Sequence, residues 1–222
     1  MCDQNEIARD LIEKLEDIRK SKIIVYITGD RPLFLQTIIA EDVIRPLYEH
    51  ILNLNFNDNE KKVIELFIYS RGGDVSVPWR IASMVRESCE EFNVLIPYKA
   101  HSAATLLSLG ADEIVMGKKG ELSPIDPSLV QSKGEQISVE DVNSFLLFIK
   151  ERANINDQSA LAQIVGTLVE KVSPTLLGNL NRMNSHIRLV ARKLITSRKE
   201  RIDEERICLL YTSPSPRDRQ KS

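Results

Sequence analysis

A serine at a predicted strand-to-helix turn, Ser102, is the residue whose position could most directly support chemistry. It follows an apolar stretch, residues 94–96, and precedes a run of small apolar residues, 103–110, with the composition of a buried helix. The first N–H groups of a helix stabilise anions, including the oxyanion of an acyl-transfer intermediate. Ser102 could therefore act as a nucleophile. The alternative is that its hydroxyl only caps the helix, the usual role of serine at such a position.

Two adjacent glycines, Gly72 and Gly73, follow another predicted buried strand, residues 63–69. Because they have no Cβ atom, they let the backbone turn sharply and approach a ligand. An N–H group of one of them, with that of Ala103, could form an oxyanion hole, although an ordinary turn explains the pair equally well. The sequence contains no GxGxxG or GxxxxGK phosphate loop and no GxSxG nucleophile elbow.

The spacing of the polar residues does not identify the base that would take a proton from Ser102. His101 is its neighbour, and neighbouring side chains point apart, so we expect a structural hydrogen bond there. Lys150 and Lys171 are possible bases or solvated helical charges, because a lysine base needs burial to lower its pKa. Asp126, between two prolines, could orient a base, bind substrate or close an Asx turn.

The elements that must position these residues alternate between strands and helices. We predict strands over residues 23–28, 63–69, 94–98 and 113–116. We predict helices over residues 1–21, 35–53 (with a kink at Pro46), 103–110, 139–153, 159–172 and 175–205, and a further helix that ends before Asn93 and has residues 81, 84, 85, 89 and 92 on its inner face. Residues 38, 39, 43, 47 and 51 are expected to face inward in the second helix, and residues 142, 145, 146 and 149 in the helix that a capping box opens at Ser138.

This alternation predicts an α/β fold with a mostly parallel sheet, covered on both faces by helices, and a helical C-terminal part. Active sites of such sheets lie at the carboxyl ends of strands. Residues 70–73 and 99–102 both follow strands, so we expect the two loops to meet at one edge of the sheet.

Composition excludes several classes of function. A net charge of −2, a pI near 6.0 and 5% aromatic residues give no nucleic-acid footprint. The three cysteines, Cys2, Cys89 and Cys208, have no CxxC spacing, so we expect no zinc site, other metal, redox motif or disulfide, and we expect Cys89 to be a buried thiol. No apolar run is long enough to span a membrane. We expect a cytoplasmic protein without a cofactor, and leave peripheral membrane association open.

The paired motifs IYSRGGDVSVPWRIA and IPYKAHSAATLLSLGADEIVMG resemble the ClpP/crotonase superfamily, and most closely the SppA-related branch known as serine dehydrogenase proteinases. In that branch S-x-G-G supplies an oxyanion amide and A-x-S-(A/G)-(A/G) carries the nucleophile. These motifs match residues 70–73 and 100–104. The A-D-x-I strand matches residues 111–114, and the L-x-P-I-D-P loop matches residues 122–127.

The resemblance implies a ClpP/crotonase-like fold and a serine peptidase that hydrolyses peptide bonds through a Ser102 acyl-enzyme. It implies a peptide or protein substrate and a homo-oligomer. No histidine lies near residues 124–127, where ClpP has its base, which favours a serine–lysine dyad. The alternatives are an acyl-thioester enzyme of the same fold and a catalytically silent oligomeric scaffold. We expect an N-terminal amphipathic helix (1–21), a protease domain (22–206) and a non-native or disordered tail (207–222).

Overall fold

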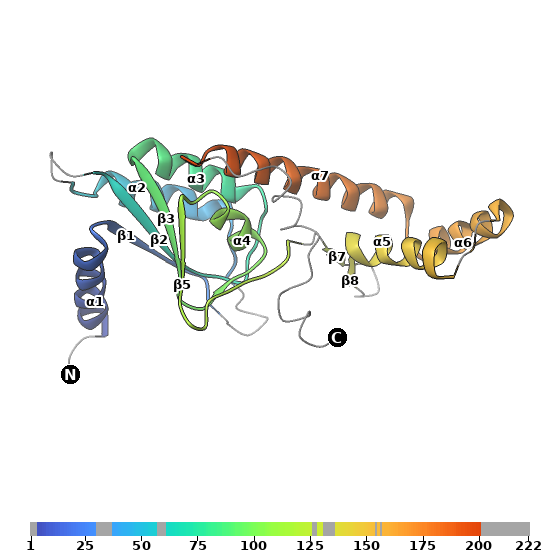
Figure 1. The fold of residues 1–222 in the computed structure, drawn as a ribbon, viewed down its shortest axis with the longest axis horizontal. Coiled ribbons are helices and arrows are strands. Elements are labelled where there is room, and N and C mark those ends of the chain that lie inside the picture. The colour runs from blue at the N-terminus through green and yellow to red at the C-terminus, as the bar shows by residue number, and fades with distance from the viewer. Residues whose placement is uncertain are drawn as a thin grey trace. The chain divides into compact units, whose positions relative to one another are not determined.

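The computed structural model describes residues 4–29, 37–56, 61–125, 128–130, 136–153, 155 and 157–200 (Figure 1). Asp126 and the predicted tail, residues 207–222, lie outside the described residues. The chain divides into two compact units, one of residues 1–125 and 190–222 and the other of residues 126–189.

The first unit is built on a four-stranded parallel sheet with the order β1-β2-β3-β5 (Figure 1). Its strands are β1 (Lys22–Ile27), β2 (Val63–Tyr69), β3 (Glu91–Ile96) and β5 (Glu113–Met116). The prediction of a mostly parallel sheet is confirmed. Strand β3 begins earlier than we predicted, so Phe92 lies in this strand and not in the preceding helix. The reason is that Phe92 pairs with Ile64 of β2 in the parallel register.

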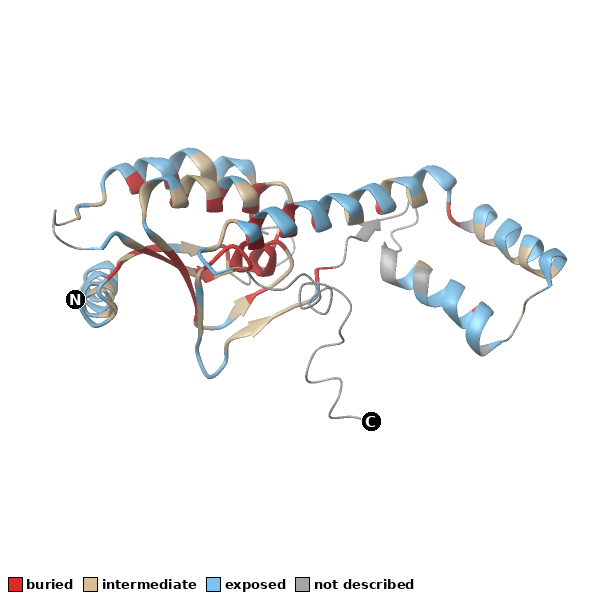
Figure 2. Cartoon of the chain, turned by 45° about the horizontal axis from the view of Figure 1, so that its top comes forward, coloured by how far each residue is buried: buried red, intermediate tan, exposed pale blue. Residues whose placement is uncertain are grey.

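Helices cover one face of this sheet. Figure 1 shows α2 (Ile44–Leu52), α3 (Val77–Ser88) and α4 (Ala103–Ser108) on one side of the strands. Ile64, Leu66 and Ile68 occupy alternate positions of β2, so their side chains lie on one face of the sheet, and all three are fully buried. Figure 2 shows the buried parts of the sheet in red. On the opposite face Val25 is 45% exposed and Ile27 is 54% exposed. The prediction that helices cover both faces of the sheet was therefore wrong at Val25 and Ile27, in the C-terminal half of β1.

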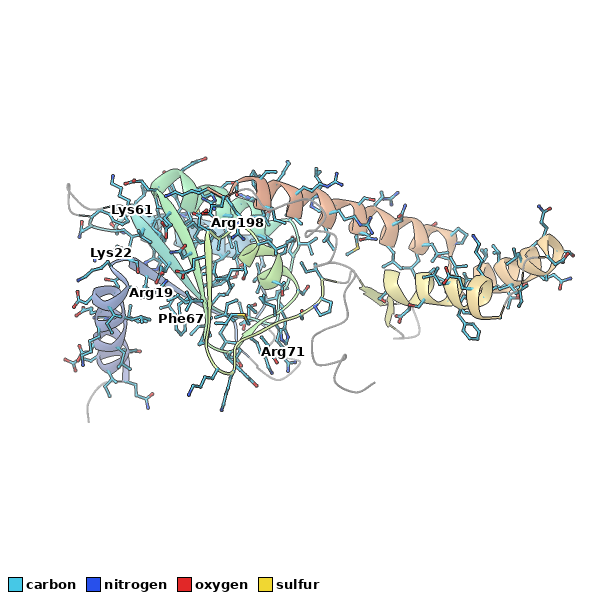
Figure 3. The ribbon with its side chains drawn as sticks, in the orientation of Figure 1. Arg19, Lys22, Lys61, Phe67, Arg71 and Arg198 are labelled. Carbon is cyan, nitrogen blue, oxygen red and sulfur yellow. The ribbon has the colours of Figure 1, made fainter. Side chains whose placement is uncertain are left out.

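The N-terminal helix α1 (Gln4–Arg19) forms as predicted but has no buried residue. Its last residue attaches it to the sheet, because the Arg19 guanidinium lies 2.7 Å from the carboxylate of Glu65 and 2.6 Å from that of Glu113. Arg19 is labelled in Figure 3. Glu65 is only 1% exposed, so this arginine neutralises a carboxylate inside the first unit.

The helix predicted over residues 35–53 begins later than expected. Residues 37–40 are not helical, a 3₁₀ turn η2 (Glu41–Val43) follows, and α2 starts at Ile44. Pro46 is the third residue of α2, where its missing N–H breaks no helical hydrogen bond, and the predicted kink is therefore unnecessary. Ile38 is 50% exposed and not inward. Ile39 is buried because it forms a bridge with Gly73 and not because it lies on a helix.

The second unit is mainly helical. The antiparallel strands β7 (Ser128–Val130) and β8 (Gln136–Ser138) precede α5 (Val139–Leu147), the π-helical segment η3 (Phe148–Arg152), α6 (Gln158–Lys171) and part of α7 (Pro174–Thr196). The capping box at Ser138 is confirmed, with both reciprocal bonds to Asp141 present. Phe145 and Leu146 are each 42% exposed, so two members of the predicted buried stripe are wrong. Helix α7 ends before the predicted residue 205, because a turn follows it.

Candidate active site

The two predicted loops meet at the carboxyl edge of the sheet. Ser70 forms a parallel bridge with Ala100, the Ser70 N–H donates to the Lys99 carbonyl (2.9 Å), and the His101 N–H donates to the Ser70 carbonyl (3.0 Å). Strand β4 (Lys99–Ala100) thus runs parallel to Ser70, the residue that directly follows β2. The expectation that both loops share one edge is confirmed.

Ser102 has an unusual backbone conformation, with φ 49° and ψ −114°. An L-residue in such a sparsely populated region costs on the order of 1–3 kcal/mol and persists only where its surroundings hold it. Ser102 precedes the first residue of α4, yet its side chain makes no capping hydrogen bond. Among the described residues no partner of the Ser102 hydroxyl is found. The alternative that this serine serves only as a helix cap therefore has no support in the geometry.

The Gly72–Gly73 turn lies directly against the serine. A methyl group at Gly72 would sit 2.7 Å from Ser102 Cβ and 3.1 Å from Ala103 N. Gly72 has φ 106°, in the left-handed region that favours glycine. Close approach to the Ser102 loop is therefore a reason for glycine at position 72.

The Ile39 segment fixes the peptide between the two glycines. The Ile39 N–H donates to the Gly72 carbonyl (2.9 Å), and the Asp74 N–H donates to the Ile39 carbonyl (2.8 Å). No peptide bond of the described chain is cis, so the Gly73 N–H points opposite to the Gly72 carbonyl and away from Ile39. A methyl group at Gly73 would lie 2.1 Å from the Ile39 carbonyl oxygen, so this packing requires glycine.

The amides that were candidates for an oxyanion hole differ in their hydrogen bonding. The Gly72 N–H donates to the hydroxyl oxygen of Ser70 (3.0 Å), which is fully buried and also 2.8 Å from the hydroxyl of Thr28. In the described part of the chain no acceptor is found for the N–H of Gly73 or of Ala103. Among the described residues the Gly72 amide therefore has an acceptor, whereas the Gly73 and Ala103 amides have none, and Ala103 is fully buried.

A hydrogen-bonded network supports the serine from the other side. The Ser102 N–H donates to the hydroxyl of Ser123 (2.8 Å), just after strand β6 (Glu121–Leu122), which pairs with β4. The Ser123 N–H in turn donates to the hydroxyl of Thr105 (3.1 Å). Sequence reasoning missed Ser70, Ser123 and Thr105 as supporting residues. Ser70 is the serine of the S-x-G-G motif, which marks its position but not its hydrogen bonds, and no periodicity pairs Ser123 with Thr105 or Ser102.

The remaining candidates for the base are His101 and two lysines. His101 Nε2 lies 3.1 Å from Glu121 Oε1, which confirms the expected structural hydrogen bond. Lys150, on η3, is exposed, and the side chain of Lys171, at the end of α6, is not described. Both lysines belong to the second unit, whereas Ser102 belongs to the first.

Metal ligation and membrane crossing find no support in the part of the chain that the structure describes. The described residues contain no group of three or more His, Cys, Asp or Glu side chains placed to hold a metal ion. None of the described helices combines the length and apolar character that crossing a membrane requires. Arg71, labelled in Figure 3, is the exposed residue between Ser70 and Gly72 in the candidate site.

The chain is similar to two archaeal proteins and to one family of serine proteinases. The uncharacterized proteins MJ0137 and MJ1495 of Methanocaldococcus jannaschii are 31% and 30% identical to this chain over 135 and 141 residues. Each match covers 58% of this chain. It covers 46% of MJ0137 and 48% of MJ1495, so this chain spans slightly less than half the length of each relative. The profile of the ClpP-like SDH-type serine proteinases matches residues 2–200. The chain belongs to this family of ClpP-like serine proteinases.

Proposed function

We propose that this protein is a serine peptidase that cleaves peptide bonds through an acyl-enzyme on Ser102. The observation that carries the proposal is the strained conformation of Ser102, whose hydroxyl caps no helix N–H. This serine lies beside the Gly73 and Ala103 amides, which have no acceptor within the described part of the chain. A structural serine has no need of such a conformation, since strain of this kind clusters at functional sites. Family membership supports the same reaction class.

In the proposed reaction Ser102 Oγ attacks the carbonyl carbon of the scissile peptide bond and transfers its proton to a base. The carbonyl oxygen becomes an oxyanion that accepts hydrogen bonds from the N–H groups of Gly73 and Ala103. Each such donor contributes about 3–4 kcal/mol to transition-state stabilisation in characterised proteases. The intermediate collapses, the amine leaves with a proton from the protonated base, and water hydrolyses the ester.

We propose that the base is a lysine, which would make a serine–lysine dyad with Ser102. The proposal is supported by the His101 ring, which already pairs with Glu121, and by the sequence, which has no histidine near residues 124–127. Lys150 and Lys171 are the candidates. Replacing each in turn with methionine, which removes the amine and keeps the apolar stem, should abolish activity at the position of the base. Full activity in both variants would assign the base to another group.

Several broader expectations remain proposals. The substrate is a peptide or protein, the active species is a homo-oligomer, and the protein works in the cytoplasm without a cofactor. Residues 22–206 form the protease domain, preceded by an N-terminal helix (1–21) and followed by a tail (207–222). Asp126 orients the base or the substrate.

The decisive experiment is covalent labelling of the purified full chain with a fluorophosphonate, a reagent that reacts with activated serines. We expect labelling of the wild-type protein and its complete loss in Ser102→Ala. The matched control is Ser185→Ala, which removes an exposed helical hydroxyl bonded to the Asn181 carbonyl and should label normally. A folded wild-type protein that does not label would contradict the proposal. Turnover of acyl thioesters, retained in Ser102→Ala, would then favour the thioester enzyme over the silent scaffold.

A further inference from the structure

The hydroxyl of Ser123 occupies a specific place beside the proposed nucleophile. It lies 2.8 Å from the Ser102 backbone nitrogen and accepts its hydrogen bond. The same hydroxyl donates to the Pro124 carbonyl (2.9 Å). Because a hydroxyl has one proton to donate, these two contacts fix its direction, with the proton toward Pro124 and a lone pair toward Ser102.

A second hydroxyl fixes the position of Ser123 itself. Thr105, 8% exposed, accepts the Ser123 N–H (3.1 Å) and donates its own proton to the Ala100 carbonyl (2.6 Å). Ala100 and Thr105 lie on the two sides of Ser102 along the chain. The network therefore encloses the strained residue, with its N–H held by Ser123 and the flanking segments tied together by Thr105.

We propose that Ser123 is a positioning residue that holds Ser102 in its reactive conformation. The hydrogen bond to the Ser102 N–H fixes the orientation of the peptide that precedes the nucleophile, and so the direction of Ser102 Cβ and Oγ. Ser123 does not touch the reacting atoms and takes no proton in the reaction. This inference rests on the proposed role of Ser102 as the nucleophile.

The test compares the fluorophosphonate labelling kinetics of Ser123→Ala with those of the wild-type protein. We expect the maximal rate constant of labelling to fall by about tenfold to a hundredfold, because misplacing a reacting group by about 1 Å costs about a hundredfold. The probe concentration that gives half the maximal rate should change little, since Ser123 does not contact the probe. Ser123→Thr keeps the hydroxyl and should restore most of the rate.

A matched control separates positioning from stability. Ser138→Ala also removes a serine hydroxyl that accepts a backbone N–H, that of Asp141 at 3.0 Å. It should lower the melting temperature and leave the labelling rate unchanged. If Ser123→Ala does not fold, Thr105→Val becomes the test, because it keeps the side-chain shape and removes the acceptor of the Ser123 N–H. A folded Ser123→Ala that labels at the wild-type rate would overturn the proposal. If Ser123→Ala does not fold, a Thr105→Val variant that labels at the wild-type rate would overturn it.

A second readout does not depend on activity. The Ser102 amide should be protected from hydrogen exchange in the wild-type protein and should exchange at least about tenfold faster in Ser123→Ala, while amides of β2 and β3 keep their rates. Unchanged exchange of the Ser102 amide would overturn the inference. If Ser123→Ala shows this faster exchange of the Ser102 amide but the folded wild-type protein does not label with fluorophosphonate, only the proposed function is refuted.

Discussion

An alanine at position 72 would place a methyl group against the residue on which the proposed chemistry depends. The methyl carbon would lie 2.7 Å from Ser102 Cβ and 2.8 Å from the His101 carbonyl oxygen. Ordinary van der Waals contact begins at 3.4 Å, so the Gly72 turn and the Ser102 loop would have to separate by several tenths of an ångström. Both neighbours belong to a tightly hydrogen-bonded loop, which cannot yield without moving Ser102.

The free-energy cost of Gly72→Ala has two parts, the unfavourable backbone conformation and the collision of the methyl group with Ser102, and a control variant separates them. Position 72 has φ 106°, and a left-handed backbone costs an L-residue about 1–2 kcal/mol. Gly29 has φ 74°, and a methyl group added there would have no atom of the described residues within 4 Å, so we expect Gly29→Ala to carry the backbone cost alone. For a chain of this size that cost lowers the melting temperature by about 2–8 °C. Gly72→Ala adds the collision with Ser102.

We therefore expect Gly29→Ala to label with fluorophosphonate at the wild-type rate despite its lower melting temperature. Gly72→Ala should label about tenfold to a hundredfold more slowly, because displacement of the nucleophile by about 1 Å costs about a hundredfold. Circular dichroism and thermal unfolding establish that both variants are folded at the assay temperature. Equal labelling rates for the two variants would refute the reasoning that Gly72 is required by its contact with Ser102.

Three other predictions concern stability and thiol reactivity. Arg19→Met leaves the carboxylate of Glu65 buried without its charged partner and should lower the urea-derived free energy of unfolding by about 3 kcal/mol. Arg45→Met, which breaks an exposed pair, should cost less than about 0.5 kcal/mol, and equal losses would contradict the argument. Burial raises the pKa of Asp112, but hydrogen bonds from an arginine and two backbone N–H groups lower it to a net value below the ordinary one. The ionised carboxylate of Asp112 therefore stabilises the fold above about pH 4, and this contribution is lost as the pH falls through the folded pKa. In Asp112→Asn the free energy of unfolding should consequently fall less steeply with decreasing pH than in the wild-type protein, and an equally steep fall would contradict the argument. Burial raises the pKa of the Cys89 thiol to about 11. In a variant whose other two cysteines are serine, iodoacetamide at pH 8 should modify this thiol at least about tenfold more slowly than a free cysteine, and equal rates would show that the thiol is accessible.

The local features of the fold could be predicted from the sequence. The apolar run of β2 and the capping box at Ser138 depend on neighbouring residues only, and both were predicted correctly. The convergence of the Ser70 and Ser102 loops was also predictable, because parallel strands place their carboxyl ends at one edge. Errors arose where tertiary contacts override periodicity, as at Ile39, which is buried by its bridge to Gly73 and not by a helix.

The details of the candidate site were decided by the tertiary structure. The sequence identified Ser102 but left open whether its hydroxyl caps α4, since both roles occur at the same position in a chain. The strained φ and ψ of Ser102 require support from Ser123, which lies 21 residues away along the chain. Likewise the choice between the Gly72 and Gly73 amides depends on the Ser70 hydroxyl and on the Ile39 segment. Residue type and spacing thus indicated which groups could do chemistry. Three-dimensional hydrogen bonding shows which of the candidate amides have an acceptor among the described residues, and this matters because each amide has a single proton to donate.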